Sequence, residues 1–395
     1  MRRLIYIFII GLLLCSYTWA DGSRYASKSL LSEGKWVKIR VDKTGIYKLS
    51  YADLKNMGFS DPSKVSVHGY GGWPLDEDFS KEYIDDVPST PVWRGSDYLL
   101  FYGKGPVKWE YDSSSQTFVH TNNPYSLYGY YFVTDATPTN DMTSVAQASG
   151  ASTRITTYDD YLLHEQELVS VNQSGREFFG EDFSGARPRT ISTFSSIPGI
   201  TDADGKVTMR FISRINSGSG TASLSINDSE LLDITIPSIQ TVSSNVRSYT
   251  KAIPGTTTAL WKGSKSEKNN VMVSYSSSGH TNVRLDYIRM QFVRTLRPYG
   301  ACTFFRSLTS VGNASRFVIS EANSNTLVFD VTDALNVKRV EADLNGSELS
   351  FTIPAGRLRE FVLVQTNQTF PSPEVVGEVA SSNLHGLEQR DMIII

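Results

Sequence analysis

Hydrophobic and polar residues alternate along much of this chain, with the period of two that is typical of half-buried β-strands. The first clear case is residues 36–41 (WVKIRV), in which every second residue from Val37 onward is apolar. Turn-forming residues follow at 42–45 (DKTG), and the alternation resumes at 46–49 (IYKL). Two alternating segments joined by such a turn predict a β-hairpin.

One short helix is predicted directly after this hairpin, because its start and stop signals are complete. Ser50 is a residue type that caps helix N-termini, and Asp53 stands at the capping-box position three residues later. Gly58 allows a left-handed exit, and Pro62 prevents the helix from continuing.

Further short strands are predicted by apolar runs between turn residues, at 64–68, 97–102 and 130–134. With the hairpin and the helix, they predict a first β-rich domain over residues 28–135. The next segment, 136–175, begins with small and polar residues and continues with the helix-compatible stretch 161–168 (YLLHEQEL). We therefore predict a linker and a second short helix over 136–175.

Alternation dominates again from residue 176 to residue 366, with strands at intervals of about ten residues. This spacing predicts a β-sandwich or jelly-roll-like domain. Around Tyr287 and Ile288 the apolar positions change from odd to even numbers, which predicts a β-bulge in that strand. Residues 367–390 are predicted to be a linker, and the apolar run 391–395 (DMIII) looks like the first strand of a further domain.

The composition agrees with this mainly β interpretation and limits the possible functions. The chain has 395 residues, which is room for two or three domains of about 100–200 residues each. Aromatic residues make up 11% of the sequence, and aromatic side chains suit a pleated surface. The formal net charge of −3 argues against nucleic acid as a partner, since phosphate binding needs an excess of Lys and Arg.

Residues 1–20 have the pattern of a secretory signal peptide. A basic start (Arg2, Arg3) is followed by the apolar run 4–14 and by Ala20, a small residue that suits cleavage before Asp21. We predict cleavage between Ala20 and Asp21, export of the protein and no transmembrane span. Cleavage would leave one cysteine, so no internal disulfide is expected.

No segment carries a strong catalytic, metal or cofactor motif. His164-Glu165 begins the zinc-protease helix motif, but Leu168 stands where the second histidine is required. Cys302 and a distant histidine (His68, His120 or His280) could in principle form a nucleophilic pair. The alternation around Cys302 indicates instead a small buried hydrophobic residue. We predict no catalytic, cofactor-binding or metal-binding residue in this chain, and no cofactor.

Several segments, in the same order along the chain, resemble the PorU-like sortases of the type IX secretion system, which are gingipain-family cysteine peptidases of Bacteroidota. These segments are residues 43–49 (KTGIYKL), 67–72 (VHGYGG), 100–106 (LFYGKGP), 175–183 (GREFFGEDF), 328–333 (VFDVTD), and 383–387 (NLHGL) before 391–394 (DMII). The sequence departs from the family pattern at Phe178, where a tryptophan is expected, and at residues 380–382.

The resemblance implies that the chain is the non-catalytic N-terminal region of such a sortase, truncated at the first strand (391–395) of a caspase-like α/β peptidase domain. That domain would carry the His–Cys dyad beyond Ile395, so His385 is not assigned a catalytic role. The parent enzyme would cleave C-terminal sorting domains from cargo at the cell surface, associated with the outer membrane, and attach the cargo to anionic lipopolysaccharide. The implied partners are its own C-terminal peptidase domain, outer-membrane secretion components and cargo sorting domains.

Two alternatives remain open at this point. The many aromatic residues of a jelly-roll domain would also suit a secreted module that binds carbohydrate or another cell-surface component. The resemblance would equally suit the N-terminal part of a different gingipain-like surface peptidase. The sequence beyond Ile395 distinguishes the first alternative, because a sortase or a surface peptidase continues into a caspase-like domain and a binding module does not.

Overall fold

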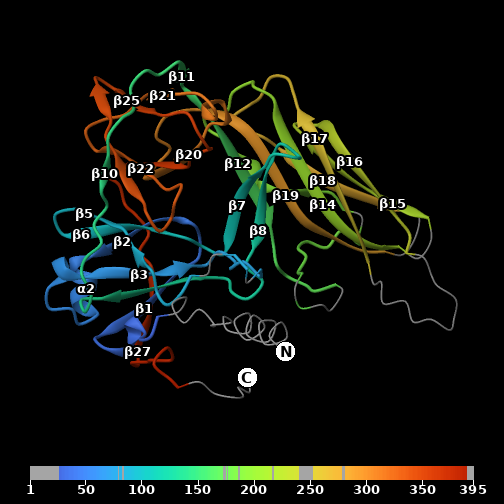
Figure 1. Cartoon of the computed structure of the whole chain (residues 1–395). Helices are drawn as coiled ribbons and strands as arrows, with labels where there is room; N and C mark the ends of the chain where they lie inside the picture. The colour runs from blue at the N-terminus through green and yellow to red at the C-terminus, as the bar shows by residue number, and fades with distance from the viewer. Residues whose placement is uncertain are drawn as a thin grey trace, which may run out of the picture.

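The protein is mainly β, as its sequence pattern predicts, and the computed structural model divides it into three β-units around a common junction (Figure 1). The structure describes residues 26–388, apart from 79, 82, 83, 172–174, 176, 186, 216, 217, 240–251 and 278–280. The predicted signal peptide (1–20) and the predicted strand 391–395 lie outside the described residues. Within the described part, no helix has the length and apolar character needed to cross a membrane.

The first unit has two facing sheets, in the orders β27-β1-β9-β3-β4 and β2-β6-β5. Its elements are η1 (Leu30–Ser32), β1 (Trp36–Val41), β2 (Gly45–Ser50), α2 (Tyr51–Asn56), η2 (Pro62–Lys64), β3 (Ser66–Gly71), β4 (Ser89–Thr90), β5 (Val92–Arg94), β6 (Tyr98–Gly103), β9 (Gly129–Thr134) and β27 (Glu374–Val379). The helix α2 forms as predicted, since Ser50 Oγ accepts from the Asp53 backbone N–H at 3.0 Å and Gly58 has φ +90°.

The predicted β-hairpin is wrong in its pairing, although both of its strands form. β1 pairs with β9 and β27, whereas β2 pairs with β6 in the other sheet. Ile39 of β1 and Leu49 of β2 enter the same core from opposite sheets. The corner between the strands is fixed by Tyr47, whose hydroxyl donates to the Lys43 carbonyl at 2.8 Å, and by Thr44, whose Oγ1 accepts from the Gly105 N–H at 3.0 Å. Facing sheets bury both apolar faces, which a two-stranded hairpin alone cannot do.

The middle unit is a sandwich of two sheets, in the orders β12-β19-β14-β17 and β13-β18-β15-β16, with one core between them. Its elements are β12 (Thr157–Glu165), β13 (Arg189–Thr190), η3 (Ser192–Phe194), β14 (Gly205–Ile215), β15 (Ser219–Ile226), β16 (Ser229–Pro237), β17 (Ile253–Trp261), β18 (Val271–Ser277) and β19 (Thr281–Thr295). The predicted β-bulge is confirmed. Arg210 lies opposite Tyr287 and Phe211 lies opposite Leu285, so Asp286 is the extra residue that the backbone pairing with β14 skips.

The short helix predicted within 136–175 is wrong, because residues 157–165 form strand β12. This strand pairs along its whole length with β19, from Thr157 opposite Thr295 to Glu165 opposite Tyr287. Tyr161 stacks on Trp109 on one side of the sheet, and Leu162 packs against the sandwich core on the other. A helix at this place would leave the β19 edge without its backbone partners, and tertiary pairing therefore overrides the local helix preference.

The third unit has sheets in the orders β10-β23-β22-β26-β20 and β11-β21-β25-β24. Its elements are β10 (Ser144–Val145), β11 (Thr153–Ile155), β20 (Cys302–Phe305), η4 (Leu308–Ser310), β21 (Ser315–Ile319), β22 (Thr326–Asp330), β23 (Lys338–Val340), β24 (Asp343–Asn345), β25 (Glu348–Ile353) and β26 (Phe361–Gln365). Val328 faces the core of this unit, while Phe329 packs against Ile46 and Leu100 of the first unit. The sandwich predicted over 176–366 thus comprises two separate cores.

Two segments connect the units into one body. The hairpin of β7 (Val107–Asp112) and β8 (Thr117–Asn122) reaches the middle unit, where the Phe118 N–H donates to Gln291 Oε1 at 2.9 Å. The segment 367–390, which the sequence predicted as a linker, contains β27, and this strand pairs with β1 at the edge of the first unit. Segments far apart in the sequence therefore lie side by side, as β1 and β27 do at the bottom of Figure 1.

Candidate functional site

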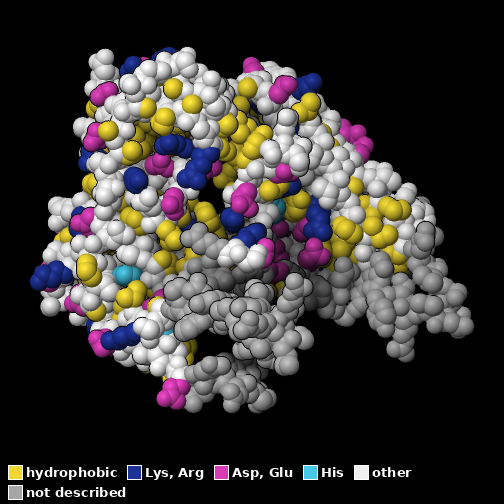
Figure 2. Space-filling view, viewed as in Figure 1, with side chains coloured by type: hydrophobic (Ala, Val, Ile, Leu, Met, Phe, Trp, Pro, Cys, Tyr) yellow, Lys and Arg dark blue, Asp and Glu magenta, His cyan; other side chains and the backbone are white. Residues whose placement is uncertain are grey.

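A cavity of about 610 Å³ lies where the three units meet, and we call it the junction cavity. Its wall includes Trp73 of the first unit, Trp109 of the β7–β8 hairpin, Tyr161 of the middle unit and Arg306 of the third. Figure 2 shows the molecule hollowed in this region, with Lys, Arg, Asp and Glu side chains gathered around the hollow. Small-molecule sites occur preferentially at such boundaries between structural units.

Three segments that resemble the sortases form part of the cavity wall. Residues 43–49 contribute Lys43 and Thr44, residues 100–106 contribute Tyr102 and Pro106, and residues 328–333 contribute Val331 and Thr332. Trp73, which directly follows the segment 67–72, also lines the cavity. The fold therefore brings together segments that the sequence keeps up to about 290 residues apart.

Glycines in and beside these segments allow their backbones to touch. A Cβ atom on Gly129 would lie 2.0 Å from the Lys104 carbonyl oxygen, and one on Gly105 would lie 2.5 Å from the Lys43 carbonyl carbon. No larger side chain fits without moving backbone at either position. These glycines thus act as contact points between chain segments.

Arg306 is the most deeply buried charged group of the wall, at 1% exposure. Its Nε donates to Glu360 Oε1 at 2.5 Å, its Nη1 donates to the Asp159 carbonyl at 3.0 Å, and its guanidinium lies 4.3 Å from the centre of the Tyr161 ring. Burial acts to lower the pKa of Arg306, but the negative charge of Glu360 outweighs it and the pKa is raised. Arg306 is therefore charged and held in place from three sides.

Arg294 and Asp160 form a second ion pair in the wall. Arg294 Nη1 donates to Asp160 Oδ2 at 2.8 Å, and the guanidinium lies 3.8 Å from the centre of the Tyr299 ring. The neighbouring Asp159 points elsewhere and accepts from the Leu308 N–H at 2.7 Å. The two carboxylates diverge, as adjacent residues of a strand should, so they cannot act on one reacting atom.

Cys302 lies in the same wall but has the environment of a packed side chain. It is partly buried and contacts the apolar cluster between the first and third units. Burial raises the pKa of its thiol to about 12, so the thiolate needed for nucleophilic attack is scarce at neutral pH. No histidine is among the described residues that line the cavity. The arrangement does not provide a Cys–His pair there.

The two residues of the incomplete zinc motif point to opposite sides of β12. His164 Nε2 lies 2.7 Å from Glu181 Oε1, whereas Glu165 Oε2 lies 3.1 Å from Nε2 of His120 on the hairpin. Across the described part of the chain, no group of three or more His, Cys, Asp or Glu side chains is placed to hold a metal ion. The predicted cleavage residues Ala20 and Asp21 lie outside the described residues.

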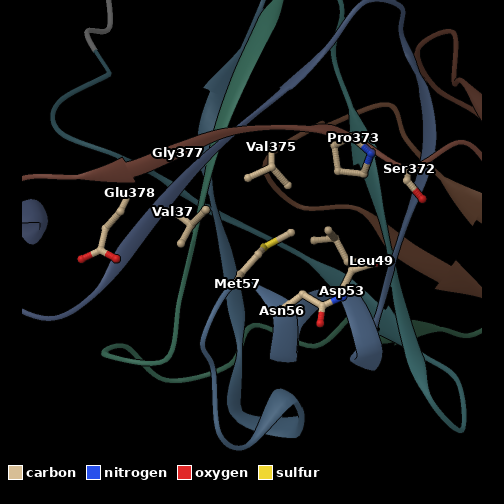
Figure 3. Close-up of a pocket in the computed structure, with 10 residues that line it drawn as sticks. All are labelled: Val37, Leu49, Asp53, Asn56, Met57, Ser372, Pro373, Val375, Gly377 and Glu378. Atoms are coloured by element: carbon tan, nitrogen blue, oxygen red, sulfur yellow. The ribbon is translucent and has the colours of Figure 1, made fainter.

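A second hollow, of about 410 Å³, lies between α2 and β27, and we call it the edge groove (Figure 3). Val37, Leu49, Met57 and Val375 point toward one another across it from β1, β2, the end of α2 and β27. Among the described strands, β27 is the edge strand of its sheet, and an edge strand can present backbone groups to a further segment. It offers an apolar contact surface at the end of the described chain.

The segment that follows β27 is attached to the start of the chain. Asn383 Oδ1 accepts from the Ser29 N–H at 2.9 Å, and the Ser382 N–H donates to the Leu31 carbonyl at 3.0 Å. His385 Nε2 lies 3.6 Å from Asp85 Oδ1. The segment 383–387, one of those that resemble the sortases, is therefore held against the first unit by its side chains.

Sequence reasoning missed the charged residues of the junction cavity. Arg306 follows an apolar strand and carries no local sign of burial, and its partner Glu360 is 54 residues away. Their meeting depends on the pairing of β20 with β26. The one usable signal was the clustering of glycine in the segments 67–72 and 100–106, which indicates close backbone contact.

No protein-family model matches this chain, and no curated protein matches its sequence. Among solved structures, it is similar to dimeric latent PorU from Porphyromonas gingivalis, with 33% identity and a TM-score of 0.83 over 93% of this chain and 35% of that one. The chain therefore spans about a third of the length of PorU.

The insecticidal δ-endotoxin Cry8Ea1 of Bacillus thuringiensis matches at 10% identity and TM-score 0.23, over 57% of this chain and 41% of that one. A Paenibacillus cycloisomaltooligosaccharide glucanotransferase matches at 10% identity and TM-score 0.18, over 56% and 48%. TM-scores this low do not indicate a shared fold.

Proposed function

Because this chain is PorU-like over nearly its whole length and corresponds to the N-terminal region of such a protein, we propose that it supports the peptidase domain of a type IX secretion sortase. In this proposal the region is not itself catalytic. It holds the peptidase domain in a fixed orientation, and the longer protein cleaves C-terminal sorting domains from secreted cargo as a gingipain-type cysteine endopeptidase.

The observation that carries this proposal is the attachment of the C-terminal segment to the first unit. β27 pairs with β1 from Trp36 opposite Val379 to Arg40 opposite Glu374. Asn383 Oδ1 then accepts a hydrogen bond from the Ser29 N–H, and these two residues are 354 positions apart in the sequence. A domain connected after residue 388 would thus leave from a fixed point, and a flexible linker would not give it a defined orientation.

The remaining parts of the proposal concern location and partners. The protein would be exported by cleavage between Ala20 and Asp21 and would act at the cell surface, associated with the outer membrane. Its partners would be its own peptidase domain, secretion components of the outer membrane and the sorting domains of cargo. The environment of Cys302 supports the non-catalytic role, because burial keeps its thiol protonated.

The test is a flexible insertion in the full-length protein of the native host. A Gly–Ser segment of about eight residues after Leu387 leaves β27 and the Asn383 contact in place but removes the fixed orientation of the peptidase domain. We expect cleavage of a cargo protein that carries a sorting domain to fall about tenfold, because misplacement by about 1 Å already costs up to a hundredfold in rate.

The matched control is the same insertion in the exposed turn between Asn345 and Gly346, which connects β24 and β25. The control should retain normal cleavage. Equal cleavage by both insertion variants and by the unmodified protein would contradict the supporting role.

A further inference from the structure

Several hydrogen-bond donors in the junction cavity have no acceptor among the described residues. The indole Nε1 of Trp73 is buried and has no such partner. The hydroxyls of Tyr102 and Tyr161 and the Nη2 of Arg306 also make no hydrogen bond to any residue that the structure describes, while Arg306 uses its Nε and Nη1. A buried donor without a partner is costly, so Trp73 Nε1 indicates a ligand atom that accepts a hydrogen bond. The other three groups add donors to the same wall, and the set indicates a ligand that presents several oxygen acceptors.

The cavity also holds a free acceptor beside these donors. Glu360 Oε1 accepts a hydrogen bond from Arg306 Nε, but Oε2 accepts none from the described residues. The Glu360 side chain is 33% exposed, so this oxygen is accessible from the cavity. A carboxylate has about four lone-pair sites and readily accepts from a hydroxyl group. The ligand should therefore donate as well as accept hydrogen bonds.

The charges of the wall balance. The positively and negatively charged residues that line the cavity are Lys43, Lys108, Arg294 and Arg306 against Asp42, Glu110, Asp160 and Glu360. Most of them are already paired, since Lys108 lies 2.8 Å from Glu110, Arg294 lies 2.8 Å from Asp160 and Arg306 lies 2.5 Å from Glu360. Among the described lining residues, only Asp42 and Lys43 form no ion pair, and both are exposed. Deeper in the cavity a charged ligand would lose its hydration without meeting an unpaired opposite charge. This favours a neutral ligand.

From these observations we infer that the junction cavity binds a neutral saccharide unit. Saccharide hydroxyl and ring oxygens accept from Trp73, Tyr102, Tyr161 and Arg306, and saccharide hydroxyls donate to Glu360 Oε2. The volume of about 610 Å³ lies within the usual range of small-molecule sites, about 300–1,000 Å³. The inference rests on the cavity alone and does not depend on the supporting role proposed above.

The test is ligand-observed saturation-transfer NMR on the purified protein. The neutral probes are maltotriose, cellotriose and N,N′-diacetylchitobiose, and trigalacturonate serves as the charged probe. We expect saturation transfer to at least one neutral probe and affinity at least tenfold weaker for trigalacturonate. The combined variant Trp73→Phe, Tyr161→Phe removes two donors but keeps the Tyr161 ring that stacks on Trp109 at 4.0 Å. It should weaken binding of that probe by about tenfold or more.

The matched control is Tyr125→Phe, because Tyr125 is 83% exposed and does not line the cavity. It should leave binding unchanged. Three results would each overturn the inference: no transfer to any neutral probe at millimolar concentration, equal affinity in the combined variant and the control, or preferential binding of trigalacturonate. None of these results bears on the insertion experiment after Leu387, so the two proposals fail separately.

Discussion

Arg306 donates from Nε to Glu360 Oε1 at 2.5 Å although the arginine is 1% exposed. Arg306 directly follows β20, Glu360 directly precedes β26, and the pairing of these strands ends with Phe305 opposite Phe361. The ladder thus places the two charges side by side at the junction. A buried charge is tolerated when it is paired and hydrogen-bonded, so each residue depends on the other.

Removing one partner of this pair should destabilise the protein strongly. We expect Arg306→Ala to lower the free energy of unfolding by about 3–5 kcal/mol, because it leaves the Glu360 carboxylate without its partner. Urea unfolding followed by tryptophan fluorescence measures this. The control is Arg357→Ala, at an exposed position, which should change stability by less than about 0.5 kcal/mol. Similar losses in both variants would contradict the importance of the pair.

The backbone contact at Gly129 should not tolerate even one added methyl group. A Cβ there would meet the Lys104 carbonyl oxygen at 2.0 Å, so Gly129→Ala must shift the backbone at one of these two residues. We expect a loss of about 1–3 kcal/mol, the usual cost of overpacking. Gly185→Ala is the control, since a Cβ at Gly185 has nothing within 4 Å. Thermal unfolding of both variants measures the difference, and a Gly129→Ala protein as stable as the control would show that the two backbones separate at little cost.

Lys104 should make stability depend on pH near neutrality. It is 3% exposed, with its Nζ 3.6 Å from the centre of the Tyr70 ring and 4.9 Å from that of Trp73. Burial lowers its pKa to about 7, while an unfolded chain keeps the ordinary value of about 10.4. Between these two values the unfolded state binds more protons than the folded state, so stability rises with pH.

The measurement compares the unmodified protein with Lys104→Met by urea unfolding between pH 7 and pH 9. The unmodified protein should gain stability relative to the variant as pH rises through this range. Well below pH 7 the difference should become constant, because Lys104 is then protonated in both states. Lys64→Met is the control, because Lys64 is exposed, and the difference in stability between this variant and the unmodified protein should not change with pH. If the stability of Lys104→Met changed with pH in parallel with that of the unmodified protein, the effect of burial on Lys104 would be contradicted.

Cys302 should react slowly with thiol reagents in the folded protein. Its pKa of about 12 leaves far less thiolate at pH 8 than the ordinary value of about 8.5 does. The sample is a protein produced from Asp21 onward, so that Cys302 is its one cysteine. We expect labelling by a disulfide reagent to be at least about a hundredfold slower in this protein when folded than in the same protein in urea. Labelling at similar rates in the two states would show that the thiol is accessible and activated.

The sequence by itself determined the local elements and the class of fold. Alternation predicted the strands over 36–41 and 46–49, the capping residues Ser50 and Asp53 predicted α2, and the change of phase near Tyr287 predicted the bulge at Asp286. Each of these signals acts over a few residues, because side-chain direction and capping depend on near neighbours in the chain. The family resemblance likewise rests on short segments, and their order along the chain made it specific.

Only the tertiary structure decided which strands pair and what the junction contains. β1 pairs with β27 rather than with β2, residues 157–165 pair with β19 instead of forming a helix, and Arg306 meets Glu360 inside the wall of a cavity. Alternation shows that a strand has an apolar face but does not identify the surface that will cover it. That choice depends on how all apolar faces of the chain are buried together, which is a property of the whole fold.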